Sequence, residues 1–169
     1  MKFIPLPPQQ LLREHFDYNP WTGVLSWRIQ TGKMKPGKQA GSQPKAGDRT
    51  HYPSVRLHDR IMLMHRVIYK WMTGEDPEYI DHINQNKSDN RWANIRSCTQ
   101  AQNNANIKRQ ASASGYKCVY PNCTGTRWVA QITNGGKRRH IGTYDTPEEA
   151  SAAYMVEARK AWGEFARAK

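Results

Sequence analysis

The stretch from residue 79 to residue 103 alternates apolar and polar segments in an order that few folds accommodate. Tyr79-Ile80-Asp81-His82 begins as a short strand, a long polar loop follows, and a second strand ends by residue 98. Thr99 is a suitable N-cap for a helix that begins at Gln100. The stretch therefore predicts two strands joined by a polar loop and followed at once by a helix.

Four polar side chains in this stretch form a pattern with a chemical meaning. Asn94 follows His82 by twelve residues, and Asn103 follows nine residues later. Hydrolysis of a phosphodiester requires an activated water and a divalent metal that stabilises the leaving oxygen. We predict that Asp81 and Asn103 bind the metal, Mg²⁺ or Mn²⁺, through oxygen. His82 is the predicted general base, and Asn94 the residue whose side-chain oxygen holds the other ring nitrogen.

Elements before the pattern are also predictable. A short helix is expected from Gln9 to Phe16, a turn from Asp17 to Gly23, and a strand after it. Residues 31–50 read as a basic loop. A hairpin over residues 52–63 then leads into a helix from Met64 to Thr73, which Gly74 ends.

These residues carry a family resemblance. His82, Asn94 and Asn103, framed by residues 80–84 and 89–96, resemble the HNH endonucleases, and more closely the phage group with asparagine in place of the last histidine. Residues 63–68 and 16–27 are similar to that group's lead-in helix and leader. The resemblance implies a ββα-metal nuclease fold and the roles assigned above. A shift of one residue in register would make Asn104 the metal ligand instead of Asn103.

The C-terminal part has its own pattern. Three short strands are expected between Tyr116 and Gly142, with a hairpin turn at Asn134-Gly135-Gly136. Thr146, Pro147 and Glu149 then have the spacing of a helix start with a capping box. Residues 114–166 resemble the AP2 DNA-binding domain, which implies a three-stranded antiparallel sheet packed on one helix. The stretch from Tyr116 to Cys123 departs from the AP2 pattern because it lacks the arginines commonly expected on the first strand.

The predicted fold class is therefore α+β with four parts. Residues 1–49 form a strand-rich N-terminal leader that contacts DNA, and residues 50–108 form a nuclease domain. Residues 109–113 are a linker, and residues 114–169 form an AP2-like domain.

The charge balance favours double-stranded DNA as the partner. Lysine and arginine number 26 against 14 acidic residues, which gives a net charge of +12 spread along the chain. Trp128 either reaches the sugar-phosphate edge or belongs to the core, and Lys137, Arg138 and Arg139 form either a DNA contact or a solvated hairpin tip. The predicted DNA-binding residues are Arg96, Lys108, Arg109, Arg127, Trp128, Gln131, Lys137, Arg138 and Arg139.

Cysteine usage and hydropathy argue against disulfides, a zinc site and a membrane span. Three cysteines are too few for a disulfide framework, and Cys118 and Cys123 lack a pair of histidines for a zinc site, so no zinc is expected. Residues 61–72 form the most apolar stretch, which is too short to span a bilayer. We expect a cytoplasmic protein, in the host cell if phage-encoded, that is a monomer or a weak dimer.

The sequence thus predicts a site-directed DNA endonuclease of the homing type with a one-metal mechanism. The first alternative is a non-catalytic, sequence-specific DNA-binding regulator that keeps the nuclease fold as a scaffold. The second is a structural or assembly protein with incidental basic charge. Neither the target sequence nor the choice between nicking and double-strand cleavage follows from the residues.

Overall fold

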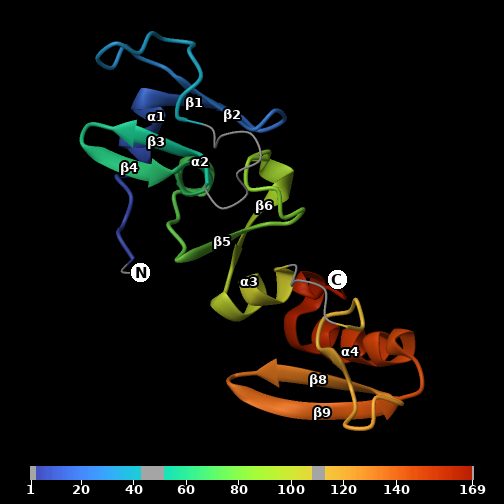
Figure 1. Cartoon of the computed structure of the whole chain (residues 1–169). Coiled ribbons are helices and arrows are strands. Elements are labelled where there is room, and N and C mark those ends of the chain that lie inside the picture. The colour runs from blue at the N-terminus through green and yellow to red at the C-terminus, as the bar shows by residue number, and fades with distance from the viewer. Residues whose placement is uncertain (1–2, 43–51, 108–112, 169) are drawn as a thin grey trace. The chain divides into compact units, whose positions relative to one another are not determined.

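The chain folds into two compact units, Met1–Cys98 and Thr99–Lys169, in a computed structural model (Figure 1). The structure describes residues 3–42, 52–107 and 113–168. No helix within these ranges is both long and apolar enough to cross a membrane.

Within residues 3–42 and 52–98, the first unit contains three two-stranded antiparallel sheets with two α-helices and one 3₁₀ turn. In chain order its elements are α1 Gln9–His15, β1 Phe16–Asn19, β2 Val24–Trp27, β3 Ser54–Leu57, β4 Arg60–Leu63, α2 Met64–Thr73, β5 Tyr79–His82, η1 Trp92–Asn94 and β6 Ile95–Cys98. The hairpin predicted over residues 52–63 and the helix that follows it are confirmed. Gly74 ends α2 in the left-handed conformation, at φ +83°, as predicted.

The turn predicted from Asp17 to Gly23 is wrong in its first half. β1 occupies Phe16–Asn19 and pairs with β2 in the register Phe16↔Trp27 and Tyr18↔Leu25. Alternate side chains of β1 are buried, with Phe16 0% and Tyr18 8% exposed. The aromatic residues therefore form a strand, and the turn is shortened to residues 20–23.

The N-terminal segment and the nuclease segment share one hydrophobic core. Leu12, Phe16 and Leu25 pack in the same buried cluster as Val67 and Ile68 of α2, and all five are fully buried. Burial of aliphatic and aromatic side chains on this scale contributes about 1.5–3 kcal/mol for each. The predicted division between residues 1–49 and 50–108 is therefore not a division of the fold.

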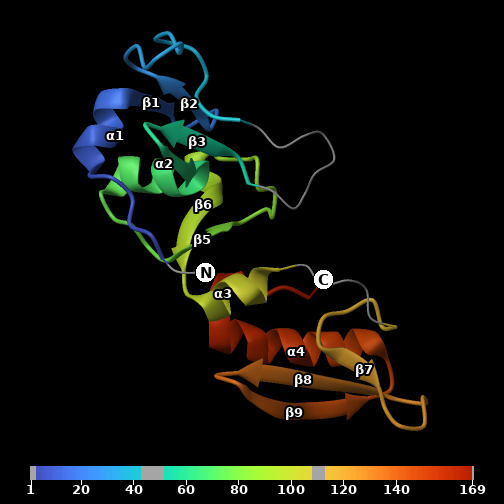
Figure 2. The same ribbon diagram turned by 60° about the vertical axis from the view of Figure 1, so that its left-hand side comes forward.

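The second unit contains a three-stranded antiparallel sheet of order β7-β8-β9, with α4 lying along it (Figure 2). Its elements are α3 Gln100–Asn106, β7 Val119–Pro121, β8 Trp128–Asn134, β9 Lys137–Tyr144, α4 Pro147–Trp162 and η2 Gly163–Phe165. The hairpin turn at residues 134–136 and the helix start at Pro147 lie where the sequence predicted them, and the Thr146 side chain accepts from the Glu149 N–H. Val119, Ala130 and Tyr154 lie at the centre of the core.

Helix α3 belongs to this second unit, so the chain divides after Cys98 rather than at the predicted linker 109–113. Thr99 caps α3 with a capping box that includes Gln102, as the sequence indicates. The other end of α3 is held by Lys117, which is 6% exposed. Its Nζ donates to the carbonyl oxygens of Asn104, Ala105 and Ile107, at 3.0, 2.6 and 3.2 Å. Of the linker, residues 109–112 lie outside the described residues.

Candidate active site

The hairpin of β5 and β6 places the predicted acid and base side by side. Asp81 pairs with Arg96 and His82 with Ile95 in the antiparallel register. Both Asp81 and His82 are only 5% exposed, although neighbouring residues of a strand normally point to opposite faces. The site is therefore built at a place where both faces of β5 are covered.

Asp81 is charge-paired across the strands. The Arg96 guanidinium lies on its Oδ2, with both Nε and an Nη atom at 3.0 Å, and the two side chains are 6% and 14% exposed. A buried carboxylate needs such a partner because desolvation of an unpaired charge is costly. The expectation that Arg96 contacts DNA is not supported by this placement, since its guanidinium is directed at Asp81.

His82 is held by a different asparagine from the one predicted. Its Nε2 lies 3.1 Å from Oδ1 of Asn90, and this contact is buried. Asn94 does not make the expected contact, because its side chain is engaged elsewhere. The Oδ1 atom of Asn94 accepts from the N–H of Asn84 at 2.9 Å, and its Nδ2 donates to Oδ1 of Asn84 and to the carbonyl of Asp89, at 3.0 and 2.7 Å.

Asn94 therefore ties the polar loop between β5 and β6 into a fixed shape. A backbone hydrogen bond also closes this loop, because the N–H of Ile83 donates to the Asn94 carbonyl at 2.9 Å. Asp89 braces the same loop by accepting from Asn84 at 2.7 Å and from the guanidinium of Arg91. The hydrogen bonds from Arg91 hold the pKa of Asp89 at about 2. Asn94 thus acts on the site through the loop and not through the imidazole.

His82 is tuned to be neutral near pH 7. Burial lowers the pKa of His82, while the hydrogen bond with Asn90 and the nearby carboxylates of Asp81 and Asp89 oppose that effect. A neutral imidazole is the form that can accept a proton from water. The structure therefore places a buried, neutral imidazole at the position predicted for the general base.

A second histidine lies against the first. The rings of His65, on α2, and His82 have centroids 5.2 Å apart and meet edge to face. The Tyr52 ring lies tilted against His65, with a centroid distance of 4.9 Å. Burial lowers the pKa of His65 to about 3, with His82, Arg66 and Lys87 adding to the effect. The Lys87 ammonium lies 4.4 Å from the centre of the Tyr52 ring. Two neutral imidazoles thus lie together, beside one ammonium group.

Asn103, the predicted second metal ligand, lies on α3 in the second unit and is partly exposed. Its role stays a prediction, as does the choice between Asn103 and Asn104. On the first unit, Asp81 supplies a buried carboxylate, which is an oxygen ligand of the kind that a hard cation prefers. Across the residues that the structure describes, no three His, Cys, Asp or Glu side chains gather as a metal cluster.

The residues predicted to contact DNA in the C-terminal unit divide into two groups. Lys137 and Arg138 are exposed at the start of β9, and Gln131 pairs with His140 across the sheet. Arg139 instead forms an ion pair with Glu157 of α4, on the helix side of the sheet. Arg127 pairs with Asp145 at 2.8 Å, and Trp128 packs against the core. Lys108 and Arg109 lie outside the described residues.

The sequence pattern singled out neither Asn90 nor His65 as a site residue. Asn90 sits among Asn84 and Asn86 in one polar loop, where asparagine is the usual turn residue, so nothing local distinguishes it. His65 lies on a helix whose apolar spacing was readable. The signal that could have found it is a histidine on the apolar face of a helix. In the structure His65 is buried on α2, with 5% of its surface exposed.

Comparison with known proteins agrees with this site. Residues 62–105 match the model of an HNH endonuclease family, a range that includes His65, Asp81, His82, Asn94 and Asn103. The chain is also 32% identical over 108 residues to a protein of Acanthamoeba polyphaga mimivirus that is named as an uncharacterized HNH endonuclease. That match covers 62% of this chain and 56% of the relative, so the chain spans about half of the relative's length. No solved structure matches.

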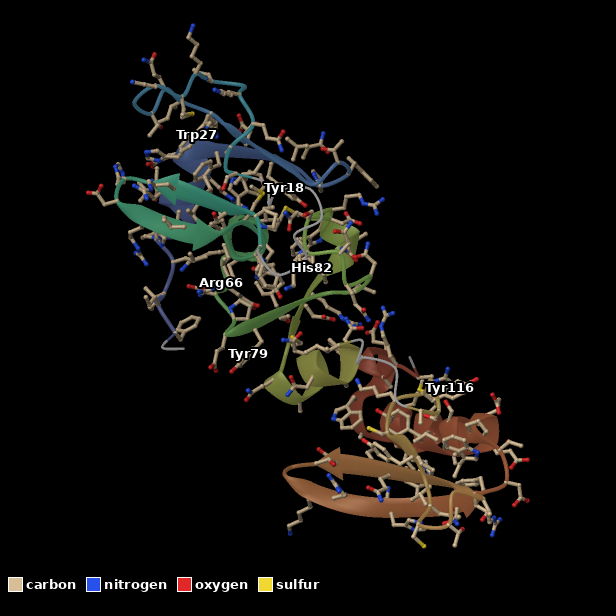
Figure 3. All side chains as sticks on the ribbon, viewed as in Figure 1. Tyr18, Trp27, Arg66, Tyr79, His82 and Tyr116 are labelled. Atoms are coloured by element: carbon tan, nitrogen blue, oxygen red, sulfur yellow. The ribbon has the colours of Figure 1, made fainter. Side chains whose placement is uncertain are left out.

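Asp81 and His82 lie on the first strand of a hairpin whose polar loop is tied by Asn94 (Figure 3). The match to the HNH endonuclease family model runs from β4 to α3, so it covers this hairpin and the helices on either side of it.

Proposed function

We propose that the protein is a DNA endonuclease of the site-directed, homing type, in which His82 is the general base. The observation that carries the proposal is the buried pair of Asp81 and His82 on β5, with the imidazole neutral and held by a carboxamide. The match to the HNH family over residues 62–105 supports the reaction class. The net charge of +12 supports DNA as the substrate.

Each side chain has a distinct part in the proposed reaction. His82 removes a proton from the attacking water, and the closed loop around Asn94 keeps the imidazole in place. Asp81 and Asn103 would hold a divalent ion, Mg²⁺ or Mn²⁺, with Asn104 as the alternative ligand. When bound, such an ion neutralises phosphate charge and stabilises the leaving oxygen. Arg96 orients Asp81 through their buried ion pair.

The second unit is proposed to supply DNA affinity and sequence preference, as an AP2-like domain would. Arg138 and Gln131 are the candidates on the sheet, because they lie on the opposite face from Arg139. Lys137 lies on the helix side, beside Arg139 and Glu157. Base readout by a β-ribbon in the major groove requires such side chains on one face.

Plasmid cleavage tests the proposal. We expect the wild-type protein to nick or cut plasmid DNA with Mg²⁺ or Mn²⁺, and His82→Ala to lose the activity by about 100-fold or more. His58→Asn is the matched control, since His58 is exposed at the turn between β3 and β4 and its φ of +51° tolerates asparagine. Wild-type DNA binding without cleavage in any divalent metal would favour the non-catalytic regulator.

A further inference from the structure

We propose that Asn90 is a positioning residue for His82, and that the hairpin of β1 and β2 is the support that fixes Asn90. In this arrangement the carboxamide oxygen of Asn90 accepts a hydrogen bond from Nε2–H of His82, and the lone pair of the neutral ring resides on Nδ1. The inference rests on the proposed function of His82 as the base, and identifies which nitrogen performs that function.

The contact itself determines the tautomer. Oδ1 of a carboxamide has lone pairs and no hydrogen, so the imidazole nitrogen 3.1 Å from it must be the donor. A neutral imidazole carries one N–H, so donation from Nε2 leaves Nδ1 as the basic nitrogen. Asn90 is 2% exposed, and a buried hydrogen bond of this kind is not readily exchanged for water.

The β1–β2 hairpin holds the backbone of Asn90, whereas His82 contacts its side chain. The Tyr18 hydroxyl donates to the backbone carbonyl of Asn90 at 2.8 Å, and this bond is also buried. Two residues further on, the N–H of Trp92 donates to the carbonyl of Pro20 at 3.0 Å. Figure 3 labels Tyr18 and His82, the first and last side chains of this series of contacts.

Gly23 brings the hairpin close enough to act as a support. Its φ is +74°, and a Cβ at this position would lie 2.5 Å from the Arg91 nitrogen and 2.6 Å from the Asn90 carbonyl carbon. Backbone therefore packs directly on backbone at the residue that holds the imidazole. The N-terminal segment, expected from sequence to be a DNA-contacting leader, thus becomes part of the machinery that orients the base.

Nitrogen NMR of the imidazole tests the tautomer directly. The full-length protein is labelled with ¹⁵N-histidine, and long-range ¹H–¹⁵N spectra are recorded at pH 8 without metal. The signals of His82 are those that disappear in His82→Gln. We expect Nε2 to show the shift of a protonated nitrogen and Nδ1 that of an unprotonated one. A protonated Nδ1 in the wild-type protein would overturn the inference, with no variant needed.

Two substitutions then separate positioning from general stability. Asn90→Ala removes the acceptor, and we expect mixed tautomers together with a fall in kcat of about 10–100-fold and little change in KM. Asn90→Asp keeps an oxygen acceptor, and we expect it to retain the wild-type tautomer and most of the activity. Asn86→Ala is the matched control, because Asn86 lies in the same loop and is exposed. Wild-type kcat and tautomer in Asn90→Ala would contradict the proposal.

The two proposals fail in distinguishable ways. If no divalent metal supports cleavage, the proposed function fails, while a protonated Nε2 in the spectra still confirms the structural inference. If the wild-type protein cleaves DNA but His82 is protonated on Nδ1, the function stands and the role of Asn90 is refuted.

Discussion

Replacing Gly23 with alanine tests whether the β1–β2 hairpin really rests on the loop that holds His82. Two separate effects should destabilise this variant. Alanine at φ +74° is in the left-handed region, which costs about 1–2 kcal/mol for a residue with a Cβ. The new Cβ also approaches Arg91 N and the Asn90 carbonyl carbon to 2.5 and 2.6 Å, far inside the 3.5–4.0 Å of an ordinary contact.

The second effect is the larger one, because the obstructing atoms are backbone and cannot rotate away. Overpacking of this kind costs about 1–3 kcal/mol. Together the two effects give a loss of about 3 kcal/mol in the free energy of unfolding. For a unit the size of Met1–Cys98, this corresponds to a fall of about 12 °C or more in Tm.

Gly37→Ala separates the two effects. Gly37 has a similar φ of +79°, but no atom lies within 4 Å of the position that its Cβ would take. We expect a loss of only about 1 kcal/mol there, so the difference between the two variants reports the backbone contact alone. Urea unfolding and calorimetry of both variants give the comparison. In the same proteins, Gly23→Ala should lower kcat while Gly37→Ala leaves it unchanged.

The result that would refute the reasoning is a Gly23→Ala variant within 0.5 kcal/mol of Gly37→Ala. In that case the hairpin would not press on the loop at Asn90, and it would not support the proposed base.

Three further outcomes follow from the structure. Lys117→Met should destabilise the second unit by about 2–3 kcal/mol in urea unfolding, because a charged donor to three carbonyls is lost, whereas Lys160→Met, at an exposed site, should change it little; equal losses would contradict the capping role. The carboxylate of Asp89, whose pKa is lowered from 3.8 to about 2, contributes stability that is present above pH 4 and lost as the pH falls towards 2. A shift of that size corresponds to about 2.5 kcal/mol, and solvent screening of the half-exposed guanidinium partner reduces it to about 1 kcal/mol; Asp89→Asn should remove this pH dependence from acid titrations, and its persistence would refute the assignment. Arg138→Ala should weaken DNA binding and reduce the salt slope by about one, while Arg139→Ala, which breaks an ion pair within the protein, should leave that slope unchanged; the reverse order in gel-shift titrations would contradict the assigned faces.

Caps and turn residues in the sequence predicted those elements that are fixed by interactions within a few residues. The glycine that ends α2, the Thr99 cap of α3 and the turn at residues 134–136 each act within a few residues of themselves, and the structure has all three. The sequence pattern also located the Asp81–His82 pair, because Asn94 and Asn103 follow it at a characteristic spacing, after one helix and into another.

Contacts between distant segments were not predictable in the same way. Three asparagines of one loop have the same local preferences, and only the packing of Gly23 and Tyr18 against residue 90 selects which amide meets the imidazole. Similarly, the polarity of α3 says nothing about its neighbours. Lys117 and Arg167, from segments further along the chain, determine that the helix belongs to the C-terminal unit.

The buried lysine at the end of α3 has a consequence for anyone who wishes to exchange parts between such proteins. A seven-residue helix is too short to persist alone in water, so α3 depends on the cap that Lys117 provides. A chimera joined within residues 109–113 would separate the helix from its cap and supply a foreign residue in its place. The workable junction lies at Thr99, because a graft made there transfers the helix, its cap and the three-stranded sheet together.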